Sequence, residues 1–152
     1  MTDLPEDDEY ERRFAGVEKI YGDEAFRQYE HSHVMVIGIG GVGSWAVEAL
    51  ARTGIAELTI IDMDVVAASN INRQLPAMSS TLGREKIEVM AERCYSINPR
   101  IKINLVDDYL TPDNVKELLE CKPDVVLDCI DDVKAKLALM LHCRFNKIPL
   151  IV

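Results

Sequence analysis

The sequence lacks any run of about 20 apolar residues, the length that a membrane-spanning helix needs. Basic residues are few, with 17 Lys and Arg against 26 Asp and Glu and a net charge of −9. This balance argues against a basic nucleic-acid-binding surface on this segment. The four cysteines form no CxxC pair, so no zinc knuckle is visible. Free thiols in apolar segments are typical of a reducing compartment, and we expect a cytoplasmic location.

The chain has 152 residues, 48% of them hydrophobic, which is enough for one domain with its own core. Residues 1–9 are acidic and polar, unlike a signal peptide, and we expect them to form a tail. Residues 148–152 (IPLIV) are typical of a buried strand, where a domain rarely ends. We therefore expect residues 10–152 to be the N-terminal part of a longer protein.

Short apolar segments alternate with helical patterns along the chain. Strands are predicted over residues 33–39, 57–62, 101–106, 124–128 and 149–152. Helices are predicted over residues 44–53, 83–97, 111–121 and 132–146, and residues 10–29 also favour helix. This alternation predicts an α/β fold, a Rossmann-like, doubly wound and mainly parallel sheet with helices on both faces.

A glycine-rich turn, G-x-G-x-x-G, lies between the first of these strands and the helix that follows it. Gly38 permits the tight turn, Gly40 allows a phosphate to approach the backbone, and Gly43 lets the helix pack close to the sheet. Asp62 ends the second strand, where an acid can hold ribose hydroxyls. A turn of this kind can bind NAD or ATP, so it does not identify the nucleotide.

Charged residues further along the chain favour ATP. The guanidinium of Arg73 suits a polyphosphate, and Lys86 is a candidate second cation, with an exposed helix lysine as the alternative. Asp131 follows the fourth strand, at the sheet edge where ligands bind, and can hold Mg²⁺ against triphosphate oxygens. Either Asp131 or Asp132 could instead cap the next helix, and we assign the cap to Asp132.

In order along the chain, five segments resemble the adenylation domain of the ubiquitin-activating-enzyme-like superfamily. They are residues 38–43, 62–64, 69–74, 83–86 and 128–131. Other segments of the sequence are similar to the subgroup of tRNA threonylcarbamoyladenosine dehydratases rather than to the activators of sulfur-carrier proteins. These segments include residues 13–16, 43–55, 107–115 and 144–150.

The resemblance implies an enzyme that binds MgATP, transfers AMP to a carboxylate and releases pyrophosphate. In the dehydratases the carboxylate belongs to N6-threonylcarbamoyladenosine in tRNA, and an internal nitrogen then closes a ring with net loss of water. The resemblance also implies a homodimer, and it allows a sulfur-transfer accessory protein as a partner. The tRNA-binding surface would lie outside this acidic segment, because phosphate contacts come from Lys and Arg.

The same resemblance implies roles for individual residues. Nucleotide binding falls to Gly38, Gly40, Gly41, Gly43, Asp62, Asp64, Asn70, Arg73 and Lys86. Asp131 would bind the magnesium ion, and Arg13, an exposed helix residue on the alternative interpretation, would reach the ATP of the partner subunit. The catalytic set is then Arg13, Arg73, Lys86 and Asp131.

Three other functions stay open from the sequence. The first is adenylation of the C-terminus of a ubiquitin-like sulfur carrier, although those activators commonly have Asp-Asn where this chain has Asp131-Asp132. The second is an NAD-dependent oxidoreductase, which would not need Arg73, Lys86 and Asp131 together. The third is an ATP-binding half without catalytic activity.

Overall fold

A five-stranded sheet with the strand order β3-β2-β1-β4-β5 forms the centre of the computed structural model, which describes residues 7–152. The strands are β1 (His33–Ile37), β2 (Glu57–Ile61), β3 (Lys102–Val106), β4 (Val125–Asp128) and β5 (Leu150–Ile151). All neighbouring strands run parallel, and β1 lies in the middle with Val36 opposite Ile60 on one side and Leu127 on the other. The predicted parallel sheet is confirmed.

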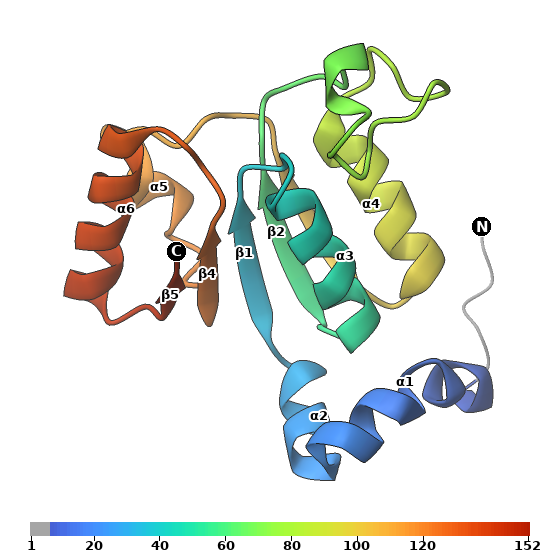
Figure 1. Ribbon diagram of the computed structural model, residues 1–152. Helices are drawn as coiled ribbons and strands as arrows, with labels where there is room; N and C mark the ends of the chain where they lie inside the picture. The colour runs from blue at the N-terminus through green and yellow to red at the C-terminus, as the bar shows by residue number, and fades with distance from the viewer. Residues whose placement is uncertain (1–6) are drawn as a thin grey trace.

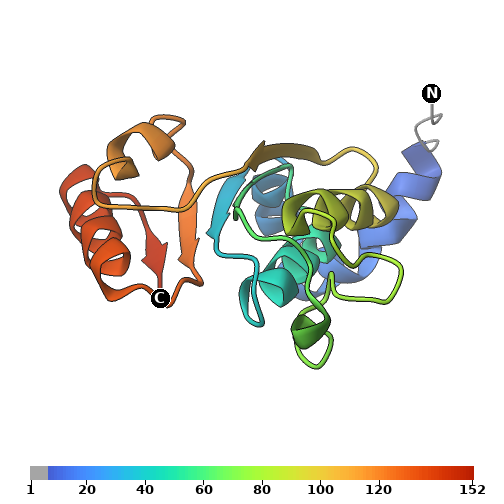
Figure 2. The same ribbon diagram turned by 90° about the horizontal axis from the view of Figure 1, so that it is seen from above.

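Helices cover both faces of this sheet. The α-helices of the described residues are α1 (Asp7–Tyr21), α2 (Asp23–Tyr29), α3 (Gly43–Thr53), α4 (Lys86–Ile97), α5 (Val115–Leu118) and α6 (Val133–Asn146), and the last four of them cover the sheet. Helices α3 and α4 pack on one face, and α5 and α6 pack on the other (Figures 1 and 2). This arrangement confirms the doubly wound fold class. No helix in residues 7–152 is long and apolar enough to cross a membrane.

Two apolar clusters, one on each face of the sheet, make up most of the core. Alternate residues of β1 serve the two clusters, because successive side chains of a strand point to opposite faces. Val36 packs with Val47 of α3 and Met90 of α4, whereas Met35 packs with Leu139 of α6. Burial on both faces explains why β1 is a nearly continuous apolar run rather than an alternating one.

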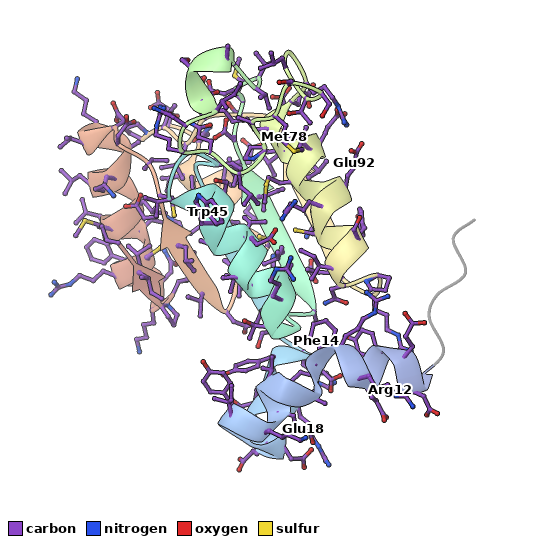
Figure 3. All side chains as sticks on the ribbon, turned by 45° about the vertical axis from the view of Figure 1, so that its right-hand side comes forward. Arg12, Phe14, Glu18, Trp45, Met78 and Glu92 are labelled. Carbon is purple, nitrogen blue, oxygen red and sulfur yellow. The ribbon has the colours of Figure 1, made fainter. Side chains whose placement is uncertain are left out.

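The N-terminal helices extend the domain below α3 (Figure 1). Phe14 is buried and lies where α1 meets the rest of the domain, whereas Arg12 lies on the far side of that helix (Figure 3). Within the expected tail, residues 7–9 form the first residues of α1, and residues 1–6 lie outside the described part. Glu9 pairs with Arg13 one turn later at 2.8 Å, which supports this first turn of helix.

Two predicted helix boundaries are wrong. The helix placed at residues 83–97 begins only at Lys86, because Gly83 has a φ of +82° and Glu85 forms an antiparallel bridge with Val65. The helix placed at residues 111–121 is reduced to the single turn α5, and residues 112–114 form a turn before it. In both places a local turn replaces the first part of the expected helix.

Candidate nucleotide-binding site

A cavity of about 1040 Å³ opens at the carboxyl ends of the central strands. Nine of the residues predicted to form the site line it: Gly38, Gly40, Gly41, Asp62, Asp64, Asn70, Arg73, Lys86 and Asp131. They come from the glycine turn, from the segment between β2 and α4 and from the turn after β4. The two remaining predicted residues, Gly43 and Arg13, do not line this cavity.

Close packing of the backbone accounts for two glycines of the turn. Gly38 has a φ of +90°, and a Cβ atom there would lie 2.8 Å from the carbonyl oxygen of Cys129. A Cβ atom at Gly43 would lie only 1.7 Å from the carbonyl oxygen of Gly38. Gly43 therefore brings the first turn of α3 against the glycine turn, the role that the spacing predicts.

Gly40 differs from these two glycines. A Cβ atom at Gly40 would have Gln74 Nε2 as its nearest neighbour, at 3.8 Å, which is an ordinary contact distance. The packing of the chain therefore does not require glycine at this position. Approach of a ligand to the backbone from the cavity would require it, as the sequence predicts.

Asp62 joins the end of β2 to the glycine turn. Its Oδ2 accepts a hydrogen bond from the Ile39 backbone N–H at 2.6 Å, and its Oδ1 accepts one from the Asp64 N–H at 2.7 Å. This structural role is additional to the predicted one. A carboxylate has about four acceptor positions, so Asp62 can accept these bonds and still receive ribose hydroxyls.

Lys86 is buried, with 4% of its surface exposed, so the alternative of an exposed helix lysine is wrong. Its Nζ lies 2.7 Å from Asp64 Oδ2, and the Tyr109 hydroxyl donates to Asp64 Oδ1. Hydrogen bonds from Lys86 and then Tyr109 lower the pKa of Asp64. The bond to Asp64 raises the pKa of Tyr109 to about 12, because a phenolate would face a carboxylate.

Sequence reasoning did not find Tyr109 as a site residue. It lies in the loop after β3, whose carboxyl end shares the edge of the sheet with the predicted site. Its partner Asp64 is 45 residues away in the chain. The rule that ligands bind beyond the carboxyl ends of parallel strands was the signal that could have drawn attention to this loop.

The segment that carries Arg73 packs against the glycine turn. Arg73 Nη1 donates to the Ser69 carbonyl oxygen at 3.0 Å, and the side chain lies beside Gly41. The indole N–H of Trp45, on the first turns of α3 (Figure 3), donates to the Arg73 carbonyl oxygen at 3.0 Å. The contact with Trp45 fixes the backbone of Arg73, the contact with Ser69 holds its guanidinium, and the residue lines the cavity.

The turn after β4 carries the two adjacent acids. Asp132 Oδ1 accepts a hydrogen bond from the Ala135 N–H at 2.7 Å, which confirms Asp132 as the cap of α6. Asp131 lines the cavity. Within residues 7–152, no group of three or more acidic, His or Cys side chains could bind a metal ion by itself. Mg²⁺ at Asp131 would take its other oxygen ligands from phosphates and water, an arrangement that this ion favours.

Arg13 lies on α1, away from the nucleotide cavity of its own chain. Its Nη1 donates to the Ile97 carbonyl oxygen at 3.1 Å, and its Nη2 donates to Glu9. It lines a second cavity of about 670 Å³, together with Arg52 and Arg93. The structure therefore does not bring Arg13 to the other predicted site residues, and its reach to a partner subunit stays a prediction.

The sheet, the glycine turn and the cavity at the strand ends define this protein as a Rossmann-like α/β domain of the nucleotide-binding type. A family model described as "ThiF family" matches residues 10–152. The chain belongs to the ThiF family.

Relatives within this family are similar over most of the chain. The tRNA threonylcarbamoyladenosine dehydratase of Haemophilus influenzae is 50% identical over 151 residues, which are 99% of this chain and 58% of that protein. The structure of Escherichia coli tRNA N6-threonylcarbamoyladenosine dehydratase in complex with ATP has a TM-score of 0.93 and 48% identity. That match covers 97% of this chain and 60% of the solved chain.

A molybdopterin-synthase adenylyltransferase from Salmonella typhimurium is 36% identical over 130 residues, 86% of this chain and 51% of that protein. In all three comparisons the chain spans little more than half the length of the relative.

Proposed function

We propose that residues 10–152 are the ATP-binding adenylation domain of a longer enzyme, one that dehydrates N6-threonylcarbamoyladenosine in tRNA. One cavity, which brings together the glycine turn, Arg73, Lys86 and Asp131, carries this proposal. The identity of 50% to a dehydratase, against 36% to a molybdopterin-synthase adenylyltransferase, supports the substrate assignment.

ATP fits this cavity better than NAD. Arg73, Lys86 and Asp131 line the same cavity and match a triphosphate and its magnesium ion, whereas a dinucleotide has only two phosphates to neutralise. The E. coli relative is described in complex with ATP. On this proposal Asp62 binds the ribose, Asn70 and Arg73 bind phosphates, and Gly40 and Gly41 allow the phosphates close to the backbone.

The reaction has two steps. A carboxylate oxygen of the nucleoside attacks the α-phosphorus of ATP, the bond to the β-phosphate bridging oxygen breaks, and pyrophosphate leaves. A nitrogen of the same side chain then attacks the acyl carbon, a ring closes, and AMP leaves with one oxygen of the carboxylate. The nitrogen proton is released, so the nucleoside loses the atoms of one water.

This chain contributes charge and position to the first step. Lys86 and Arg73 neutralise the negative charge that grows on the departing pyrophosphate, and such preorganised charges are a main source of rate in phosphoryl and nucleotidyl transfer. Mg²⁺ bound at Asp131 would neutralise further charge on the phosphates. No buried general base is required, because the attacking carboxylate is already ionised at neutral pH.

Two kinds of partner belong to the proposal. Following the resemblance, we infer a homodimer in which Arg13 of each subunit approaches the nucleotide of the other; within its own chain Arg13 lies away from the cavity. We place the tRNA-binding surface in the part of the enzyme beyond this acidic segment.

A second candidate is adenylation of the C-terminus of a sulfur-carrier protein, which the similarity to a molybdopterin-synthase adenylyltransferase favours. Both candidates use the same nucleotide cavity and differ in the carboxylate that is activated. The cavity alone therefore does not distinguish the two candidate functions, and an experiment with the two substrates is needed.

The experiment incubates the full-length protein with MgATP and tRNA that carries N6-threonylcarbamoyladenosine. Mass spectrometry of the digested tRNA is expected to show loss of one water from that nucleoside, and only when ATP is present. An unchanged nucleoside, together with pyrophosphate exchange that depends on a small carrier protein, would contradict the proposal and support the second candidate.

A further inference from the structure

Asp64 is tied to Lys86 through both backbone and side chain. The Lys86 N–H donates to the Asp64 carbonyl oxygen at 3.1 Å, and Lys86 Nζ lies 2.7 Å from Asp64 Oδ2. The neighbouring residues Val65 and Glu85 form a bridge, so the two segments run side by side here. The segment after β2 and the start of α4 are therefore held together at the wall of the nucleotide cavity.

Each oxygen of the Asp64 carboxylate has a different partner. Oδ2 receives Lys86 Nζ, and Oδ1 receives the hydroxyl of Tyr109 from the loop after β3. That loop is fixed independently, since Asn114 Nδ2 donates to the Tyr109 carbonyl oxygen at 2.8 Å. Asp64 thus connects a buried lysine to an anchored tyrosine across the cavity wall.

We propose that Asp64 is a positioning residue for Lys86 rather than a ligand of the nucleotide, and that Tyr109 holds Asp64 in place. This inference rests on the proposed function and replaces the nucleotide-binding role that the resemblance implies for Asp64. The physical reason lies in Lys86, whose side chain is 5% exposed. A buried ammonium group needs a counter-ion, and its four-carbon stem is flexible unless the head group is fixed.

Charge also argues against direct contact between Asp64 and the phosphates. A carboxylate beside a polyphosphate would repel it, whereas a carboxylate that is paired with Lys86 holds the ammonium group in position. The ribose does not require Asp64 either, because Asp62 lies at the end of β2 on the same wall. Asp64 therefore acts on the phosphates through Lys86 alone.

The test uses the full-length protein and compares ATP with adenosine, which has no phosphates. Dissociation constants are measured by calorimetry for Asp64→Asn, Lys86→Met, the double variant and Tyr109→Phe. We expect Asp64→Asn to weaken ATP binding on the order of tenfold, and Tyr109→Phe by a few fold, with adenosine binding unchanged. Asp107→Asn, an exposed acid in the same loop as Tyr109, is the matched control and should change neither.

The double variant shows whether Asp64 and Lys86 act as a coupled pair or as two independent residues. If Asp64 acts through Lys86, Asp64→Asn adds nothing to the loss of ATP affinity that Lys86→Met causes. In the absence of any nucleotide, Asp64→Asn should lower the melting temperature, and Lys86→Met should restore much of it by removing the unpaired buried charge.

Three results would overturn the inference. They are an equal loss of ATP and adenosine affinity in Asp64→Asn, additive losses of ATP affinity in the double variant, and no coupling between the two substitutions in thermal stability. If Asp64→Asn does not fold, unchanged ATP affinity in Tyr109→Phe would count against the inference. Failure of the unaltered protein to bind ATP would overturn the proposed function itself. The melting temperatures test the pairing of Asp64 with Lys86 separately, because they are measured without nucleotide.

Discussion

Two glycines of the same turn should respond to alanine in opposite ways. At Gly43 the new Cβ atom would lie 1.7 Å from the carbonyl oxygen of Gly38, about 1.3 Å closer than any real contact of this kind. The neighbour is backbone and cannot rotate away, so the first turn of α3 must move. We expect Gly43→Ala to lower the free energy of unfolding by about 3 kcal/mol, at the upper end of overpacking effects.

At Gly40 the Cβ atom has room, since its nearest neighbour would be 3.8 Å away. Its φ is not in the left-handed region, so alanine causes no strain there. We expect the stability of Gly40→Ala to be unchanged or raised by up to about 1 kcal/mol, because alanine restricts the unfolded chain. ATP affinity should fall on the order of tenfold, because a methyl group would stand between the backbone N–H groups and the phosphates.

Urea unfolding and calorimetric ATP titration of the two variants, in full-length protein, check this pair of expectations. Equal destabilisation by both substitutions would refute the distinction between a packing glycine and a ligand-facing glycine. Unchanged ATP affinity in a folded Gly40→Ala variant would refute the position given to the phosphates.

Three further predictions concern charged residues. Asp131→Ala should reduce ATP-dependent turnover by about a hundredfold or more, measured as AMP release, and unaltered turnover would remove Asp131 from the mechanism. Co-expressed Arg13→Ala and Lys86→Met chains should recover about a quarter of normal activity, because half of a random dimer mixture contains one intact site; no recovery would exclude Arg13 of the partner. Burial raises the pKa of Glu48, but hydrogen bonds from its arginine partners, Arg93 foremost, lower it overall. This acid therefore contributes stability above its unfolded pKa of about 4.3, and the contribution is lost as pH falls. Glu48→Gln should cost about 1 kcal/mol at neutral pH, because both arginine partners are partly exposed to solvent, and it should remove this acid dependence in urea titrations; equal stability of both proteins would contradict it.

Local features of the sequence predicted the fold and much of the site. The strands were recognisable as apolar β-branched runs, and Asp132 as a cap, because each depends on a few neighbouring residues. The glycine turn was recognisable for the same reason. Parallel topology then places the ends of the strands at one edge, which is why residues as distant as Gly38 and Asp131 were expected together and line one cavity.

Contacts between distant segments were not predictable in the same way. Lys86 is buried because it meets Asp64, 22 residues earlier, and no local pattern distinguishes it from an exposed helix lysine. Tyr109 reaches Asp64 across 45 residues. The start of α4 was misplaced because the bridge between Val65 and Glu85 keeps the chain extended up to Lys86. Each of these features depends on the tertiary fold.

We propose that this domain uses ATP to adenylate the carboxylate of N6-threonylcarbamoyladenosine. The most direct measurement labels that carboxylate with a heavy oxygen isotope and follows the label during one turnover of the full-length protein with MgATP and tRNA. The proposal predicts one labelled oxygen in the AMP and none in the pyrophosphate. Label that appears in inorganic phosphate, with ADP as the other product, or label that stays out of AMP while the ring closes, would contradict it.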